Sequence, residues 1–226
     1  MNILAIDIGG THIKMLRTGE QTKRAFDSGP KMTPEKMARE IEAIRGDWEW
    51  DRVSIGIPAP CAENRPLKNP VHLGAGWVDF DYEQALGCPV RIVNDAAMQA
   101  LGSYEGGKML FLGLGTGLGT TLIVDGQIIP MELGHFQYNS KHTIEHFVGE
   151  AYLLEKGHKK WQQHVLDVIQ VFQDTLLPEY IVLGGGNTKK ISKLPEGVRR
   201  GANHNAFLGG FRLWDEQATM RSPEEG

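Results

Sequence analysis

The feature that most constrains the fold of this chain is a pattern that occurs twice: an apolar strand, a glycine-containing turn and a second strand. The first copy, at about residues 3–17, reads "ILAIDIGGTHIKMLR". The second, at about residues 109–129, contains "LGLGTGLGTTLIVDG". Each copy is followed by alternating helix and strand patterns. The sequence therefore predicts an α/β protein with a coarse internal duplication and a seam between its halves near residues 95–107.

The periodicity of apolar residues predicts the elements that fill the two halves. Strands are expected within residues 2–9, 11–19, 52–60, 90–95, 108–115, 120–129 and 180–186. Helices are expected within residues 33–46, 96–107, 143–157, 159–178 and 202–217. The first helix has the clearest boundaries, because Thr33 is a favoured N-cap, Pro34 suits the first helical position and Gly46 ends the pattern. Residues 69–87 are expected to form a loop with one or two helical turns.

Composition narrows the class of partner. The chain has 226 residues, a formal net charge of −4 and no basic run, so a nucleic-acid partner is not expected. Cys61 and Cys88 form no disulfide framework, which is typical of a reducing cytoplasm. No apolar stretch reaches the roughly 20 residues of a membrane span, and the first residues do not resemble a signal peptide. We expect a cytoplasmic protein that binds a small molecule.

The glycines from Gly113 to Gly119 stand at every second position and fit more than one kind of loop. A Rossmann fingerprint requires a helix directly after the glycines, whereas residues 120–126 predict a strand and a hairpin turn. One interpretation is a glycine-rich hairpin that binds no ligand. The alternative is a phosphate loop: with Thr11 and Thr116 in the two turns, backbone N–H groups facing each other across a cleft would hold a phosphate chain.

Three motifs, in order along the chain, resemble those of the superfamily of sugar kinases, actin and heat-shock chaperones. "AIDIGGTHIK" is similar to its first phosphate motif, "LGLGTGLGTTLIVDG" to its second and "IVLGGGNTKK" to its adenosine motif. Within that superfamily, "IVNDA" at residues 92–96 and "ELGH" at residues 132–135 resemble the ROK family (repressor, open reading frame, kinase). "GGGNTKK", "GHKKWQQHV" and "GANHNAFLGGF" are similar to segments of its polyphosphate glucokinase branch.

The chain departs from the usual ROK pattern at two places. Most ROK proteins carry a cysteine-rich zinc motif after ELGH, whereas the stretch here is "FQYNSKHTIEHF"; the polyphosphate branch also lacks the motif. No zinc is therefore expected, and we interpret His142 and His146 as solvated helix side chains. The usual Pro-Gly of the first sugar loop is replaced by Pro58, Ala59 and Pro60.

The resemblance implies a two-lobed actin-like ATPase (ribonuclease H-like) fold with an interlobe cleft. Residues 1–96 would form the N-terminal lobe, completed by the C-terminal helix at about 205–226, and residues 97–204 the C-terminal lobe. The implied activity is transfer of a phosphoryl group from ATP or polyphosphate, with Mg²⁺, to a hexose hydroxyl, with glucose O6 favoured. Family members are often homodimers, so a homodimer is expected.

Two alternatives stay open for the function. One is a ROK kinase for another sugar, such as fructose, mannose or an N-acetylated amino sugar. The other is a non-catalytic sugar-binding or regulatory protein, as some members of the family are repressors.

Asp95 is the candidate catalytic base. It follows a predicted strand and precedes a predicted helix, where the family places the carboxylate that accepts the proton of the sugar hydroxyl. The alternative is an ordinary helix N-cap, a position that Asp favours strongly.

Asp7 follows a buried strand, where a carboxylate is costly unless it is paired or close to a cation. The family reading places it near the metal and phosphates, contacting Mg²⁺ through water. The alternative is an Asx turn on the glycine backbone. The full set of candidate phosphate and nucleotide ligands is Asp7, Gly9, Gly10, Thr11, Lys14, Gly115, Thr116, Gly117, Gly184, Gly185, Gly186 and Lys189.

The resemblance also implies a set of sugar ligands. Glu132 and His135 of "ELGH" would bind sugar hydroxyls, the glutamate by accepting and the histidine by donating or accepting. The other candidates are Asn69, Asn94, Asp95 and Glu145.

Overall fold

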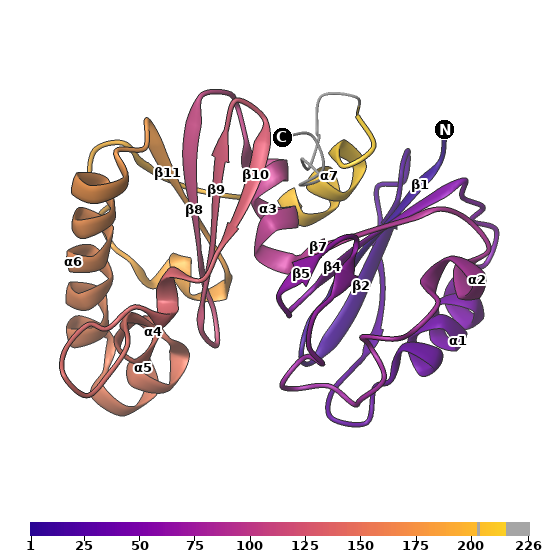
Figure 1. Cartoon of the computed structure of the whole chain (residues 1–226), viewed down its shortest axis with the longest axis horizontal. Helices are drawn as coiled ribbons and strands as arrows, with labels where there is room; N and C mark the ends of the chain where they lie inside the picture. Colours follow the sequence, from indigo (N-terminus) through magenta and orange to yellow (C-terminus); the bar gives the residue numbers. More distant parts are fainter. Residues whose placement is uncertain (203, 216–226) are drawn as a thin grey trace. The chain divides into compact units, whose positions relative to one another are not determined.

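A computed structural model describes residues 1–202 and 204–215, which form two compact units (Figure 1). Unit 1 comprises Met1–Gly102 with the described residues from His204 onward, and unit 2 comprises the described residues of Ser103–Asn203. The lobe change expected between residues 96 and 97 falls inside helix α3 (Asp95–Ser103), most of which belongs to unit 1.

Unit 1 contains a five-stranded sheet in the order β3-β2-β1-β4-β7. Its strands are β1 (Ile3–Ile8), β2 (His12–Arg17), β3 (Arg24–Asp27), β4 (Arg52–Ile57) and β7 (Val90–Asn94). β1 is antiparallel to β2 and parallel to β4, and β4 is parallel to β7. The sequence did not predict β3, since four residues are too few for periodicity to show. A small hairpin, β5 (Cys61–Ala62) and β6 (Arg65–Pro66), follows β4.

Successive side chains along each strand point to opposite faces of this sheet, so both faces carry side chains that helices can cover. Leu4 and Ile6 lie in a core cluster with residues of α1 (Pro34–Ile44) and with Tyr82 of α2 (Tyr82–Leu86). Thr33 caps α1 as expected, accepting a hydrogen bond from the Lys36 amide at 3.3 Å. Ala5, between Leu4 and Ile6, faces α7 (Asn205–Arg212), where a methyl group on Gly210 would come within 2.6 Å of its Cβ.

Helices α3 and α7 pack with their backbones in direct contact. A methyl group on Gly102 would lie 1.8 Å from the Asn205 carbonyl oxygen, and one on Gly209 equally close to that of Met98. Only glycine permits this approach. The helix predicted over 202–217 thus exists as α7 over a shorter range, and residues 216 and 217 lie outside the described part of the chain.

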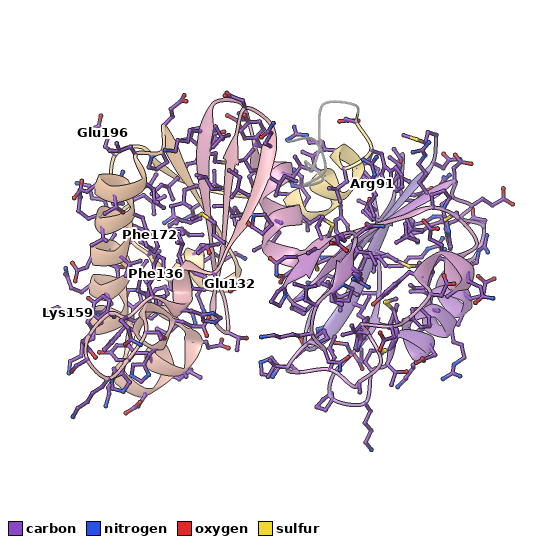
Figure 2. The ribbon with its side chains drawn as sticks, viewed as in Figure 1. Arg91, Glu132, Phe136, Lys159, Phe172 and Glu196 are labelled. Atoms are coloured by element: carbon purple, nitrogen blue, oxygen red, sulfur yellow. The ribbon has the colours of Figure 1, made fainter. Side chains whose placement is uncertain are left out.

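Trp214 fastens the end of this segment to the sheet of unit 1. Its indole N–H donates to the Ser54 hydroxyl at 2.9 Å, and that hydroxyl donates to the Gly210 carbonyl at 2.5 Å. The guanidinium groups of Arg52 and Arg91 lie 4.6 and 4.4 Å from the centre of the Trp214 ring (Arg91 is labelled in Figure 2). Cation–π contacts therefore add to the helix packing.

Unit 2 contains a five-stranded sheet in the order β10-β9-β8-β11-β12. Its strands are β8 (Lys108–Leu114), β9 (Leu118–Val124), β10 (Gln127–Met131), β11 (Tyr180–Gly184) and β12 (Val198–Arg200). The residues expected as one strand within 120–129 form two, because Asp125 and Gly126, both at positive φ, make the hairpin turn that residues 120–126 predict. β12 was not predicted.

The helices of unit 2 lie after β10 and around β11. They are η1 (Leu133–His135), α4 (Ile144–Val148), α5 (Glu150–Lys156), α6 (His158–Leu176) and η2 (Gly186–Lys190). The single helix predicted within 143–157 is broken at Gly149, whose ψ of 167° is extended. A methyl group on Gly149 would lie 2.8 Å from the Thr116 carbonyl oxygen, so the break brings α4 and α5 against the glycine turn.

Helix α6 has the apolar face that its sequence predicts. Phe172 lies on the side of α6 toward the strands and Lys159 on the outer side (Figure 2), in keeping with a buried phenylalanine and an exposed lysine. In the part of the chain that the structure describes, no helix is both long and apolar enough to cross a membrane.

Candidate functional site

The glycine turn of unit 1 joins β1 to β2 and brings two charged residues together. Asp7 pairs in register with Lys14, and the Lys14 ammonium lies 3.9 Å from the Asp7 carboxylate. The Asp7 side chain is only 19% exposed. Burial raises the pKa of Asp7, and the charge of Lys14 opposes that shift in part. The carboxylate is therefore held where a cation would stabilise it.

The turn itself is held by residues that the sequence did not single out. The Gly9 amide donates to the His12 carbonyl at 3.0 Å, and the Ser28 hydroxyl donates to the Gly9 carbonyl at 2.5 Å. The Ser28 amide also donates to the Thr11 carbonyl at 2.9 Å. Ser28 directly follows β3, which was not predicted, so no sequence motif indicated that Ser28 lies beside the turn. Thr11 is exposed, with its hydroxyl 3.1 Å from a ring nitrogen of His12.

The residues around Asp7 fit Mg²⁺ held mainly by other ligands. Mg²⁺ prefers oxygen ligands, retains several waters and is commonly shared between one or two carboxylates and substrate phosphates. Among residues 1–202 and 204–215, no three histidine, cysteine or acidic side chains converge as a metal site. Asp7, a buried carboxylate beside a glycine turn, supplies one such oxygen ligand. The residues present are thus compatible with an Mg²⁺ ion that is bound to the phosphates of the phosphoryl donor and contacts Asp7 through water.

Asp95 and Asn94 lie where strand β7 runs into helix α3. The Ala96 amide donates to Asn94 Oδ1 at 2.9 Å and lies at the same distance from Asp95 Oδ1. The Asn94 side-chain amide donates to the Ala59 carbonyl at 3.1 Å. Asn94 therefore caps the start of α3 together with Asp95, whereas the sequence predicted a cap by Asp95 alone. Both polar atoms of the Asn94 side chain have protein partners.

Cys61 lies close to this strand end and was not predicted as a site residue. Its thiol donates to the same Ala59 carbonyl at 3.4 Å. Burial, with a smaller effect from the charge of Asp95, raises the pKa of Cys61 to about 12. Cys61 is therefore a neutral thiol next to Asp95, and it offers a weak donor where a second anion would be costly.

Asn64 anchors the β5–β6 hairpin to the open edge of β7. Its side-chain amide donates to the Val90 carbonyl at 2.7 Å, and its Oδ1 accepts from the Ile92 amide at 2.7 Å. The residue adopts φ 61°, a left-handed conformation that asparagine tolerates. The Asn64 side chain thus makes the two backbone hydrogen bonds that a neighbouring strand would make with β7, and it fixes the position of the loop that contacts Asn94.

Asn69, a predicted sugar ligand, supports its own loop. Its Oδ1 accepts hydrogen bonds from the amides of Gly76 and Trp77 at 3.1 and 3.0 Å. The side-chain oxygen of Asn69 therefore stabilises the loop. The contact of Asn69 with a sugar stays a prediction, and it would be made by the side-chain nitrogen.

The glycine turn of unit 2 joins β8 to β9 and is formed from backbone groups. The Gly115 amide donates to the Gly117 carbonyl at 3.1 Å, and Gly113 pairs with Gly119 in the strands. Apart from its chain neighbours, no described residue lies within 4 Å of where a methyl group on Gly115 would stand. Thr116 uses its carbonyl to accept from the Glu150 amide at 3.2 Å. The turn therefore presents bare backbone on one side, as a phosphate loop requires.

The segment after β11 supports this turn through a residue that the sequence did not single out. Asn187 is buried and donates from its side-chain amide to the Gly115 carbonyl at 3.2 Å. Lys190 donates to the Asn187 Oδ1 at 2.9 Å. Lys189, the predicted phosphate ligand, is exposed beside Lys190. Of the two lysines, Lys190 is thus tied to the turn.

The three glycines at the end of β11 have different surroundings. Gly184 is the last strand residue and is buried. Gly185 has φ 85°, and a methyl group there would lie 2.3 Å from the Leu114 carbonyl oxygen. A methyl group on Gly186 would meet nothing among the described residues within 4 Å, apart from its chain neighbours. Gly185 is required for packing, whereas Gly186 leaves open space.

Glu132 and His135 lie on one short turn of unit 2 (Glu132 is labelled in Figure 2). Their side chains are 52% and 68% exposed, with His135 Nδ1 4.0 Å from a Glu132 carboxylate oxygen. Thr120 holds this segment: its hydroxyl donates to the Met131 carbonyl at 2.6 Å and accepts from the Leu133 amide at 3.1 Å. The pair is thus exposed and positioned, as ligands of a polyhydroxyl compound would be.

Aromatic residues fill the region where most ROK proteins carry a zinc motif. His142 and His146 are both exposed, as predicted for solvated side chains, and their rings stack with centres 4.0 Å apart; His142 precedes helix α4 and does not lie on it. His164 lies 3.0 Å from the Tyr138 hydroxyl and 3.1 Å from that of Tyr152 through its two ring nitrogens. This cluster packs α4, α5 and α6 together.

The two units follow one plan, in which a glycine hairpin leads a five-stranded sheet that continues into parallel strands. This is the actin-like ATPase fold. The chain belongs to the ROK family, whose sequence model matches residues 3–146. Among curated proteins it is similar to a polyphosphate glucokinase of Mycobacterium tuberculosis (strain ATCC 25177 / H37Ra), 25% identical over 211 residues, which cover 83% of this chain and 78% of the relative.

Solved structures support the assignment of the fold. The inorganic polyphosphate/ATP-glucomannokinase from Arthrobacter sp. strain KM aligns with a TM-score of 0.77 and 22% identity, over 92% of this chain and 96% of that one. A ROK family glucokinase from Streptomyces griseus, in complex with glucose and AMPPNP, aligns with a TM-score of 0.74 and 15% identity, over 94% and 99%.

Proposed function

We propose that this protein is a sugar kinase that transfers a phosphoryl group from ATP or inorganic polyphosphate to a hexose hydroxyl, with glucose O6 as the favoured acceptor. Membership of the ROK family and the names of the similar proteins support the class of reaction. The observation that carries the proposal is the position of Asp95, at the end of β7 and the start of α3, beside an asparagine whose two polar atoms have fixed partners.

In the proposed reaction Asp95 accepts the proton of the sugar hydroxyl. The hydroxyl oxygen forms a bond to the terminal phosphorus of the donor while the phosphoanhydride bond breaks, leaving ADP or a polyphosphate one unit shorter. Asn94 holds the start of α3 in place, and the neutral thiol of Cys61 adds no second negative charge near the base. Glu132 and His135 hydrogen-bond sugar hydroxyls and so orient the acceptor.

The donor phosphates are bound by backbone amides of the glycine turns at Gly115–Gly117 and Gly9–Thr11. Within these stretches the Gly9 and Gly115 amides donate inside their own turns, so the amides that follow them serve the donor. These turns offer N–H groups without side-chain bulk. Asp7 and the donor phosphates would hold Mg²⁺, Asp7 through water, and the bound ion would supply positive charge near the transferred group. Lys14 adds a cation beside Asp7.

The decisive experiment is a kinase assay that crosses glucose, mannose, fructose and N-acetylmannosamine with ATP and polyphosphate. We expect transfer to glucose at the highest kcat/KM. Preference for another sugar would replace glucose as the acceptor and leave the class of reaction intact. Sugar binding in calorimetry with no transfer from either donor would contradict the proposal and favour a non-catalytic sugar-binding protein.

A further inference from the structure

A loop at residues 69–77 lies beside the glycine turn of unit 1. Apart from the chain neighbours of Gly10, the three atoms nearest to the point where a methyl group on Gly10 would stand all belong to His72. They are its Cβ at 3.4 Å, its Cγ at 3.9 Å and its Cδ2 at 4.0 Å. These are ordinary van der Waals distances, so the imidazole ring of His72 borders the turn without straining it.

Contacts on both sides of His72 hold this loop in place. Before His72, the side-chain oxygen of Asn69 accepts two amide hydrogen bonds from the far end of the loop. After it, Leu73 is buried and the Gly74 amide donates to the Met32 carbonyl at 2.8 Å. A methyl group on Gly74 would lie 2.9 Å from that carbonyl oxygen. The packing of the loop therefore sets the position of His72, and its ring is not needed for this purpose.

The ring of His72 is available to a ligand. Across the described residues it makes no hydrogen bond and no ion pair, and the residue is exposed. The other histidine at this turn differs: His12 Nδ1 lies 3.1 Å from the Thr11 hydroxyl, and His12 Nε2 lies 3.5 Å from the Asp27 carboxylate. Of these two histidines, His72 is thus the one whose N–H group has no protein partner in the described part of the chain.

The chemistry of the His72 ring suits a phosphate group at this turn. The Gly10 and Thr11 amides are the N–H groups that the proposed donor would use here. A neutral imidazole adds one N–H donor beside them, and a protonated imidazole adds a positive charge as well. The charge of Lys14 is partly offset by Asp7, 3.9 Å away, whereas no described carboxylate pairs with His72. A phosphate oxygen beside Gly10 would therefore gain a charge-assisted hydrogen bond from His72.

We propose that His72 is a further binding residue for the donor phosphates at the Gly9–Thr11 turn, held beside that turn by the loop at residues 69–77. The inference rests on the proposed function for the identity of the donor. Binding of a phosphate compound next to His72 can be measured without phosphoryl transfer.

Substitution of His72 separates a donor ligand from a sugar ligand. In His72→Ala the N–H group is lost, and we expect donor KM to rise about tenfold or more with sugar KM unchanged, as for loss of a hydrogen bond to a charged group. His72→Gln keeps an N–H donor without the positive charge, so donor KM should rise less. The matched control is Val71→Ala, in the same loop and 89% exposed, which should change neither constant. A rise in sugar KM with donor KM unchanged, or no change in either constant, would overturn the proposal.

Proton NMR of the His72 ring tests the contact without any turnover. The His72 signals are identified by their absence from the spectrum of His72→Gln. We expect them to shift when ATP or tripolyphosphate is added and to stay in place when glucose is added. A shift with glucose alone, or no shift with either phosphate compound, would overturn the inference even if the protein is a kinase. If the wild type transfers no phosphoryl group, the proposed function fails, while a shift with tripolyphosphate still confirms the phosphate contact.

Discussion

The two glycine hairpins both pair antiparallel strands, but they differ in the residues at the second pair from the turn. In unit 1, Ile8 pairs with Ile13 next to the turn, and Asp7 with Lys14 follows. In unit 2, Leu114 pairs with Leu118, and Gly113 with Gly119 follows. The same position therefore carries an acid and a base in one unit and two glycines in the other.

This difference indicates that the two hairpins act through different groups. Unit 1 presents charged side chains at its turn and a carboxylate at the end of β7. Unit 2 presents backbone, and the charged groups that support its turn, Glu145 and Lys190, come from other segments. We infer that substitutions of side chains in unit 1 affect chemistry most, whereas substitutions of glycines in unit 2 affect the shape of the donor site.

The largest expected effect is that of Asp95→Asn. Removal of a general base should lower kcat by about 10²- to 10⁴-fold, while sugar binding in calorimetry is retained. Asparagine is as good a helix cap as aspartate, so thermal stability should change little. Asp81→Asn, at the cap of α2, is the matched control and should leave kcat unchanged. Near-normal turnover in Asp95→Asn would remove the assignment of the base.

The next effect separates two adjacent glycines of unit 2. Gly185→Ala should cost about 2–4 kcal/mol of unfolding free energy, because of its positive φ and the nearby Leu114 carbonyl. Gly186→Ala should leave stability within about 0.5 kcal/mol and raise donor KM, since its methyl group enters open space. Chemical denaturation and donor kinetics measure the two effects. Equal stability losses would show that both glycines serve packing alone.

A smaller effect is expected from Asn64→Ala in unit 1. Loss of the two hydrogen bonds to β7 should cost about 1–3 kcal/mol and lower kcat less than Asp95→Asn does. Glu63→Ala is the matched control, because residue 63 also has positive φ while its side chain is exposed. If kcat is unchanged in Asn64→Ala, the hairpin supports the fold and not the base.

The smallest effect concerns the stability of unit 1 as a function of pH. The pKa of Asp7 is raised in the folded state, so the stability present below about pH 3.8 is lost as pH rises through the folded-state pKa. Asp7→Asn removes this dependence and should raise Tm relative to the wild type at neutral pH more than at pH 3.5. Lys14→Met should lower the relative stability at neutral pH, because it removes the opposing cation. Identical pH profiles for wild type and Asp7→Asn would contradict this account.

Much of the fold follows from local patterns in the sequence. The Gly-rich turns, the capped helix after Thr33 and the amphipathic α6 all depend on neighbouring residues, and all are present. The elements that were missed, β3 and β12, are short strands that exist because a longer strand offers them an edge. The break at Gly149 likewise depends on Thr116, far away in sequence.

In the candidate site, too, the residues of local motifs were predicted, whereas the residues that act through distant contacts were not. Motifs placed Asp7, Asp95 and the glycine turns at strand ends, but the roles of the ligands in catalysis stay predictions. The supporting residues Ser28, Asn64 and Asn187 escaped notice, because a side chain that bonds a distant backbone group leaves no periodic signal. "NTKK" directed attention to Lys189, whereas the contacts favour Asn187 and Lys190.

The close packing of α7 has a consequence for folding during synthesis. Ala5 and Ser54 are covered by a helix that leaves the ribosome only after residues 103–202 have been made. Unit 2 is continuous in sequence and can complete its core first. Until α7 has been synthesised, one face of the sheet of unit 1 stays uncovered. We therefore expect the sheet of unit 1 to finish folding last, and a nascent chain stalled before Phe207 to expose that face to chaperones.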